Sequence, residues 1–279
     1  MKTVRTLFLL FALSLLGACS NTFLYNQLDW LATWYVDDYV DLSREQRRDL
    51  KQQVRELLAW HRKEELASYI EILDQIEADL DQPVSSEQVE AWANETYLAY
   101  MRLEERMLPV AFDMGNQLTD AQMEEFMESL RRGQEELEEE YLTRSDEEYV
   151  EDAREGLGDA LEDFLGRLTP EQKMTLDTAA ASLQRFDGAW LDERALWLDT
   201  LAVLLQREPG WEDGVRKALD EREANRTETY RTAYAHNAVI INGAIAEVLN
   251  LRTGKQDRRL RREIDGYRKD IRKLIAQVD

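Results

Sequence analysis

The chain has 279 residues, and its 57 Asp and Glu outweigh its 35 Lys and Arg to give a formal net charge of −22 at pH 7. Nucleic acid and anionic lipid both attract basic surfaces, so this balance argues against a nucleic-acid partner and against electrostatic adhesion to a membrane. Hydrophobic residues make up 44% of the chain and aromatic residues 9%, which argues against disorder and indicates a folded, charge-covered protein.

The start of the chain has the order of charge, apolar run and small residues that is typical of a secretion signal. A basic start precedes an apolar core over residues 7–16, which is too short to span a bilayer as a mature helix. Residues 16–19 then read Leu-Gly-Ala-Cys and resemble a bacterial lipobox. The resemblance implies that residues 1–18 are a signal peptide and that Cys19 is acylated.

Acylation of Cys19 would attach the protein to a membrane through its acyl chains. A single chain of myristoyl length binds with only about 10⁴ M⁻¹, so stable attachment takes two or more. The next residue is Ser20 and not the aspartate of inner-membrane retention signals, which implies the outer membrane, facing the periplasm. Because Cys19 is the single cysteine, no intramolecular disulfide can form, and the fold must rest on apolar packing.

Residues 19–41 form an aromatic-rich N-terminal segment, and residues 42–279 form the predicted helical domain, with a possible sub-boundary near residues 142–146. Four aromatic residues gather within ten positions of the segment, namely Trp30, Trp34, Tyr35 and Tyr39. Such residues suit a membrane–water interface or an interaction surface. They also make an apolar helical face with Leu28, Leu31 and Val40, and we favour the interpretation that this face is core.

The same segment is rich in aspartate, with carboxylates at Asp29, Asp37, Asp38 and Asp41. Such a cluster could bind a divalent cation. Aspartate is also common at helix caps and first turns, and no Asp-x-Asp-x-Asp-Gly loop is present. We therefore expect helix-terminal roles and no metal site.

Apolar residues recur at helical spacing through most of the chain, and only 12 glycines and 4 prolines interrupt it. The pattern predicts an all-α fold, an antiparallel multi-helix bundle with long helices and no strands. We expect a kink at Pro109, a turn at Gly115-Asn116, a bend near Gly188 and a helix end at Gly254. The apolar stripes predict helical or buried segments over residues 43–80, 89–110, 123–141, 145–164, 176–205, 215–249 and 260–278.

Charge is unevenly distributed between two regions. The basic C-terminal region (residues 251–279) holds ten Lys or Arg against five Asp or Glu, and the acidic region (residues 120–163) holds eighteen acidic residues against four arginines. We expect these regions to pack near each other or simply to solvate their helices, and a partner-binding patch is the alternative.

Four expected helix starts share an apolar residue, a Ser or Thr, two further residues and a glutamine, with the glutamines at Gln46, Gln88, Gln122 and Gln172. This is the spacing of a capping box, in which the hydroxyl accepts a hydrogen bond from a backbone N–H and the glutamine reaches back to the cap. The elements also resemble the Leu-Thr-x-x-Gln repeats of the Spy and CpxP periplasmic chaperones. That resemblance implies an alternative function as an ATP-independent chaperone or envelope-stress protein.

A longer resemblance covers residues 25–42 and the Trp60-His61-Arg62 run. These residues are similar to the N-terminal signature of a family of uncharacterised helical proteobacterial lipoproteins. The family implies no activity, cofactor or catalytic residue for this chain.

An enzymatic function has little support in the residues. Only His61 and His236 are present, which excludes a multi-histidine metal site, and there is no nucleophile elbow, phosphate loop or dinucleotide fingerprint. His61, near Glu64 and Glu65, could act as an acid or base with His236, but we expect both histidines to be satisfied polar residues at helix interfaces. A cell-wall hydrolase is the least favoured alternative, because no carboxylic acid stands out for that role.

The sequence therefore predicts a non-enzymatic, lipid-anchored outer-membrane protein that faces the periplasm and binds other envelope proteins through helical surfaces. No cofactor, metal or nucleic acid is expected.

Overall fold

The computed structural model describes residues 21–277, in which every regular element is a helix and no strand occurs. The predicted all-α class is confirmed for this part of the chain, whereas Cys19 and the predicted signal peptide lie outside it. The elements in chain order are α2 (Asn21–Tyr25), α3 (Leu28–Asp37), α4 (Arg44–Trp60), the π-helical turn η1 (His61–Glu65), α5 (Leu66–Asp79), α6 (Ser86–Gln117), α7 (Asp120–Leu142), α8 (Asp146–Leu165), α9 (Pro170–Ala181), α10 (Asp187–Leu204), α11 (Trp211–Glu221), α12 (Glu228–Asn250) and α13 (Gly254–Ile275).

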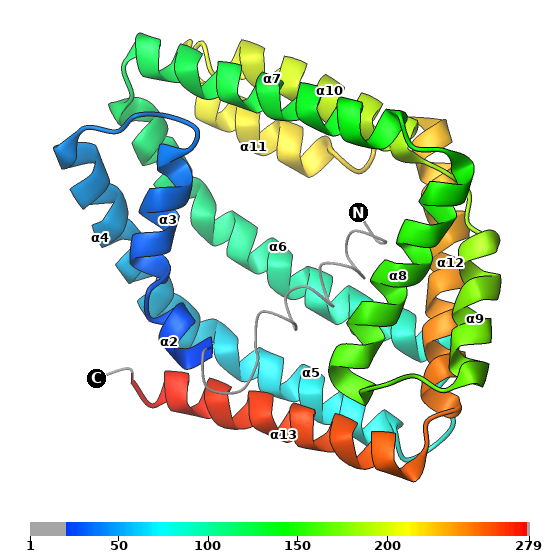
Figure 1. Cartoon of the computed structure of the whole chain (residues 1–279). Coiled ribbons are helices and arrows are strands. Elements are labelled where there is room, and N and C mark those ends of the chain that lie inside the picture. The colour runs from blue at the N-terminus through cyan, green and yellow to red at the C-terminus, as the bar shows by residue number, and fades with distance from the viewer. Residues whose placement is uncertain (1–20, 278–279) are drawn as a thin grey trace.

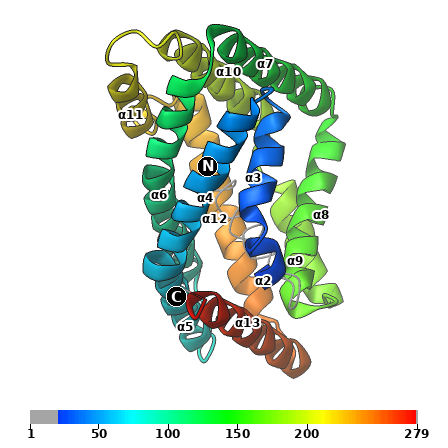
Figure 2. The ribbon, with the colours of Figure 1, turned by 90° about the vertical axis from the view of Figure 1, so that its left-hand side faces the viewer.

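The helices are arranged as a four-sided frame (Figure 1). One side is formed by α3 and α4, the next by α5 and α13, the third by α8, α9 and α12, and the fourth by α7, α10 and α11 (Figures 1 and 2). The long helix α6 runs behind the frame and packs against α4, α5 and α12. Because α13 contacts α2, the two ends of the described chain lie side by side.

The apolar core consists of two clusters of buried residues. The larger lies where α5, α6, α8, α9, α12 and α13 meet, and Val248 at its centre is fully buried. The smaller joins Leu50 and Val54 of α4 to Met114 of α6 and to Val40 and Leu42 in the turn before α4. Apolar stripes at helical spacing thus supply the packing that stabilises the frame.

The helix predicted over residues 43–80 is continuous but changes its winding at its middle. The chain passes from α4 through the π-helical turn η1 into α5 without leaving the helical conformation. Such a turn inserts extra width into an α-helix and is frequent at functional sites. Here it buries two polar residues, His61 and Glu65.

The turn predicted at Gly115-Asn116 is wrong, because α6 continues through Pro109 and Gly115 to Gln117. Gly115 is required by packing, since a Cβ atom at this position would lie 2.8 Å from the Trp211 ring. That ring also packs edge-on against Phe112, at 5.3 Å between centroids. In the sequence, a glycine that leaves room for a neighbouring aromatic ring cannot be distinguished from a glycine that forms a turn.

Two other expected boundaries are also corrected. The stretch over residues 215–249 is broken between α11 and α12, where the Thr227 hydroxyl accepts from the Tyr230 N–H and caps a new helix. The bend expected near Gly188 is confirmed, because the chain leaves the helical conformation between α9 and α10 and Gly188 is the second residue of α10. Gly254 is the first residue of α13 and not the end of the preceding helix.

The basic C-terminal region is docked, and its ion pairs with the rest of the chain run to α5 and to the turn that follows α5. Arg268 lies 2.6 Å from Asp74 and 2.5 Å from Glu77, and Arg261 lies 2.8 Å from Asp81. The region also packs against α8, which belongs to the acidic region. The expected proximity of the two regions is therefore found, but these carboxylates come from α5 and the turn after it, which lie outside the acidic region.

Candidate functional site

The aromatic N-terminal segment is held against the frame by polar contacts. The Tyr25 hydroxyl lies 2.8 Å from His61 Nδ1, and Arg62 donates to the Asn26 side chain at 2.8 Å. One turn further along, Asp29 accepts from Arg55 at 2.7 Å. These contacts join α2 and α3 to the end of α4 and to η1, so the segment has a defined orientation.

Trp30 and Trp34 lie on the solvent side of α3, and the favoured interpretation that they belong to the core is wrong. The two buried residues of α3 are the polar Asp29 and Thr33, and the partly buried Ala32 and Val36 pack beside them against the smaller core cluster. Tyr35 is exposed as well, whereas Tyr39 is partly buried and lies 6.2 Å from the Phe126 ring. The apolar stripe of the sequence is therefore divided, since its three aromatic residues in α3 point outward whereas Val40 belongs to the smaller core cluster.

Three of the four aspartates of this segment, Asp29, Asp37 and Asp41, are paired with cations of α4. Burial would raise the pKa of Asp29, but the hydrogen bond from Arg55 and the charges of Lys51 and Arg55 outweigh it and lower that pKa. Arg47 lies 2.9 Å from Asp37 and 2.8 Å from Asp41. No group of three or more potential metal ligands is found within residues 21–277.

His61 is the centre of a buried Tyr–His–Tyr node. Its Nδ1 lies 2.8 Å from the Tyr25 hydroxyl and its Nε2 lies 3.0 Å from the Tyr69 hydroxyl. Burial lowers the pKa of His61 to about 4 and raises the pKa of Tyr25 to about 12. The neutral imidazole can donate to one hydroxyl and accept from the other, so the node joins α2, η1 and α5 without any net charge.

The acid–base partners considered for His61 are engaged elsewhere. Glu65 is buried and accepts from Arg102 at 3.0 and 2.5 Å. His236 lies on α12, where its Nε2 is 3.0 Å from the Ser182 carbonyl oxygen. The structure therefore places the two histidines in separate contacts, and the role of His61 here is to connect helices.

The glutamines of the boxes do more than cap their own helices. All four boxes are formed, with the hydroxyl of the cap accepting from the glutamine N–H. In addition, the side-chain amides of Gln46 and Gln122 donate to each other at 3.0 and 2.9 Å. We call the turn between two consecutive helices a helix–helix corner. Each amide also donates to a backbone carbonyl in the corner of the other glutamine, Gln46 to Gln117 and Gln122 to Asp41.

The same arrangement recurs at the opposite end of the frame, between Gln172 and a fifth box that our sequence analysis missed. Thr253 caps α13, and its glutamine, Gln256, donates to Gln172 at 2.9 Å. Gln172 donates to the Val248 carbonyl and Gln256 to the Arg167 carbonyl. The fifth box escaped notice because Arg252 stands where the other four have an apolar residue before the cap.

Gln88 is the exception among the four predicted glutamines. It accepts from Ser85 N at 2.9 Å and serves its own cap. The corner before α6 is held by Asn250 of α12, whose side chain donates to and accepts from the Val84 backbone at 2.8 Å in both directions. Each of these helix–helix corners is thus pinned by an amide side chain from another part of the chain.

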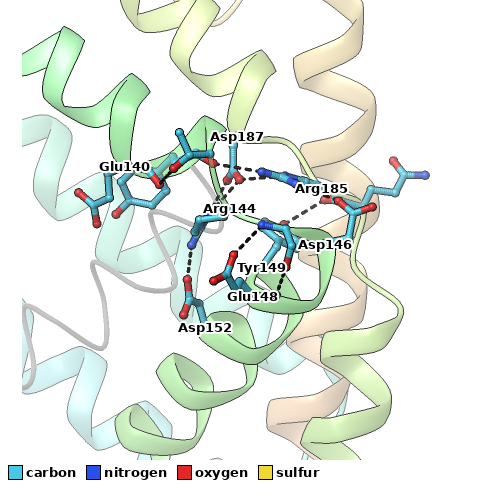
Figure 3. A network of polar contacts seen from close by, with 12 residues as sticks. Glu140, Arg144, Asp146, Glu148, Tyr149, Asp152, Arg185 and Asp187 are labelled. Carbon is cyan, nitrogen blue, oxygen red and sulfur yellow. Dashed lines mark hydrogen bonds and ion pairs between the residues drawn. The ribbon is translucent and has the colours of Figure 1, made fainter.

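A charged network fixes the corner between α7 and α8 (Figure 3). Arg144 and Arg185 converge on the buried carboxylate of Asp187, at 3.0 and 3.2 Å. Arg144 also pairs with Asp152 at 2.5 Å, and its guanidinium lies 5.5 Å from the centre of the Tyr149 ring. Because these charges are paired with each other, the network ties α7, α8 and α10 together and offers no free charge for a ligand.

Residues of the described chain line a hollow in the core and a groove at the surface. The first, about 110 Å³, lies in the larger core cluster and is lined almost entirely by apolar side chains such as Leu73, Trp92 and Ile264. It can hold only an apolar group. The second, about 390 Å³, is a groove between α10 and α11 with an apolar floor that includes Trp197 and Leu204.

Within residues 21–277, no helix has the length and apolar character needed to cross a bilayer. Comparison with curated proteins and with solved structures finds no match. Comparison with protein families finds one described as a family of unknown function, DUF6279, over residues 38–231. This range contains the four predicted boxes, η1 and the network at Asp187. Because the match covers more than half of the sequence, the chain belongs to the DUF6279 family of unknown function.

Proposed function

We propose that this chain is a lipid-anchored envelope protein without enzymatic activity, attached to the outer membrane through Cys19, and that it binds another envelope protein through a helical surface. The groove between α10 and α11 supports the binding part of this proposal. The lipobox supports the anchoring part. The engagement of both histidines in contacts between helices is consistent with a non-enzymatic role.

The main observation in support of this binding surface is that α10 has apolar residues on two of its sides. Leu191 and Leu198 are buried against the frame, while Leu196 and Val203, on another side of the same helix, are exposed. A helix with apolar residues on several sides is normally covered on those sides. Leu196 also borders the groove, whose rim includes Lys217 and Glu221. The groove thus has an apolar floor and a charged rim, as protein interfaces have.

Site-specific photocrosslinking in living cells tests this surface. A photoreactive residue at Leu196 is expected to give one discrete crosslinked product, because a fixed partner presents the same surface in every complex. The matched control is a photoreactive residue at Met174 of α9, which is 63% exposed against 54% for Leu196 but does not border the groove. The control should give no product of that size.

The pattern of products separates the alternatives. Many products of different sizes from Leu196 would favour the chaperone alternative, which suppression of client aggregation without ATP would then support. If Leu196 and Met174 give the same pattern, or if neither reacts, the groove is not the binding surface.

The anchor is tested separately. Replacing Cys19 by alanine is expected to abolish lipid labelling and to release the protein from the membrane fraction, because no other residue of the chain carries the anchor in this proposal. A labelled, membrane-bound Cys19→Ala protein would contradict it.

A further inference from the structure

Helix α3 has a partly inverted distribution of polar and apolar residues, in which Ala32 and Val36 pack against the smaller core cluster but the large aromatic residues do not. Its buried positions are Asp29 and Thr33, whereas Trp30, Trp34 and Tyr35 are 53%, 56% and 58% exposed. Phe23 of α2 is 68% exposed. A surface helix in water places its apolar side inward, so this pattern indicates that the outer side of α2–α3 does not face water alone. We call Phe23, Trp30, Trp34 and Tyr35 the aromatic face.

The inversion is built into the structure and does not reflect a loosely attached segment. Asp29 is fixed by Arg55 at 2.7 Å and by Lys51 at 3.7 Å. The Tyr25 hydroxyl is fixed by His61. Rotating α3 to bury its tryptophans would break these contacts and leave the Asp29 carboxylate without its cations. The polar contacts on the inner side therefore keep the aromatic rings on the outside.

The position of the aromatic face in the chain indicates what covers it. Helix α2 begins at Asn21, two positions after Cys19, and two steps of extended chain span about 7 Å. Acyl chains on Cys19 would therefore hold α2 at the bilayer surface. Residues 21–37 extend about 25 Å if helical throughout, which suits a segment lying along that surface.

We propose that the aromatic face lies in the headgroup region of the bilayer that holds the acyl chains of Cys19, so that α2–α3 is a second, noncovalent contact with lipid. This inference rests on the anchoring part of the proposed function. Tryptophan and tyrosine are enriched at this depth, because their rings are apolar and their N–H or O–H groups reach water. The chain carries a net charge of −22, so zwitterionic headgroups suit it better than anionic ones.

The test is quenching of tryptophan fluorescence by brominated lipid. The acylated full-length protein is placed in phosphatidylcholine vesicles with and without bromine on the upper acyl-chain carbons. We expect bromine to quench part of the emission, and we expect a Trp30→Phe, Trp34→Phe double variant to lose most of that quenchable part. The matched control is Trp190→Phe, in α10 on another side of the frame, where the ring packs against Tyr141, and this variant should leave the quenchable part unchanged.

The outcomes distinguish the face from the anchor. Protein that carries lipid label and floats with the vesicles, but is not quenched through Trp30 and Trp34, would overturn the aromatic-face proposal and leave the anchor intact. In that case a photoreactive residue is placed at position 34 instead of Trp34. A crosslink from this position to a protein would show that a protein, and not lipid, covers the aromatic face. Protein without lipid label would contradict the anchor. If such protein is nevertheless quenched when it is mixed with vesicles, the aromatic-face proposal is supported. If it is not quenched, both the anchor and the aromatic-face proposal are overturned.

Discussion

Replacing Gln172 by alanine is expected to lower the free energy of unfolding by about 3 kcal/mol, as the sum of a lost helix cap and of buried groups left without partners. The Gln172 side chain is 0% exposed, and its amide accepts from Thr169 N at 2.9 Å and donates to the Val248 carbonyl at 3.0 Å. Its removal also takes from the Gln256 amide one of its two acceptors and leaves the Arg167 carbonyl as the other. Urea unfolding at fixed pH measures the loss.

Gln88→Ala is the matched control, because Gln88 occupies the same position of the same motif. Its amide serves the Ser85 cap at a partly exposed site. The expected loss is therefore that of a cap alone, about 1 kcal/mol. If Gln88→Ala and Gln172→Ala lower the free energy of unfolding equally, the hydrogen bonds between Gln172 and the second helix–helix corner do not contribute to stability. In addition, the double variant Gln172→Ala, Gln256→Ala should lose less than the sum of the two single variants, since both remove the same pair.

The caps themselves could be predicted from the sequence, whereas their pairing could not. A hydroxyl and a glutamine three residues apart interact through the local backbone, so their spacing alone determines the cap. The pairs Gln46–Gln122 and Gln172–Gln256 join residues 76 and 84 positions apart. The local sequence does not indicate which two helix–helix corners are neighbours in space, because this depends on how all the helices of the frame pack.

The orientation of α3 was wrongly predicted for a related reason. Helical spacing shows that Trp30 and Trp34 share a side, but it does not state which side faces the protein. The deciding contact is between Asp29 and Arg55, which belongs to another helix. Hydrophobicity favours burial of the tryptophans only if the polar side of the helix has no partner inside. A buried carboxylate with two cations reverses that preference.

The Tyr–His–Tyr node was not predicted either, although His61 was singled out. The contact needs Tyr25 on the N-terminal segment and Tyr69 on α5 to meet at a π-helical turn. Ordinary helical periodicity does not anticipate that turn. The sequence signal that was present, a single histidine in an otherwise apolar stripe, indicated a satisfied residue at a helix interface, and this interpretation is confirmed.

Lowering the pH from 7 to 4 is expected to cost the protein about 3 kcal/mol of stability through His61 alone, at 1.36 kcal/mol per unit of pKa difference. Burial lowers the pKa of His61 in the folded protein to about 4, against about 6.5 in the unfolded chain. Below pH 6.5 the unfolded chain therefore binds a proton that the folded protein does not. The loss grows as the pH falls from 6.5 to 4 and levels off below 4.

The measurement is urea unfolding across this pH range for the wild type and for His61→Gln, whose amide keeps a polar group between the two tyrosines but does not titrate. Carboxylates destabilise both proteins in acid, so the difference between the two curves isolates His61. His236→Gln is the control, because His236 is exposed and should leave the wild-type curve unchanged. Parallel curves for the wild type and His61→Gln would show that the imidazole is not held neutral. A difference that grows from pH 6.5 to 4 and stays constant below pH 4 is the expected result, because the folded ring remains neutral and keeps its contact with Tyr25 over a range in which the unfolded chain takes up a proton.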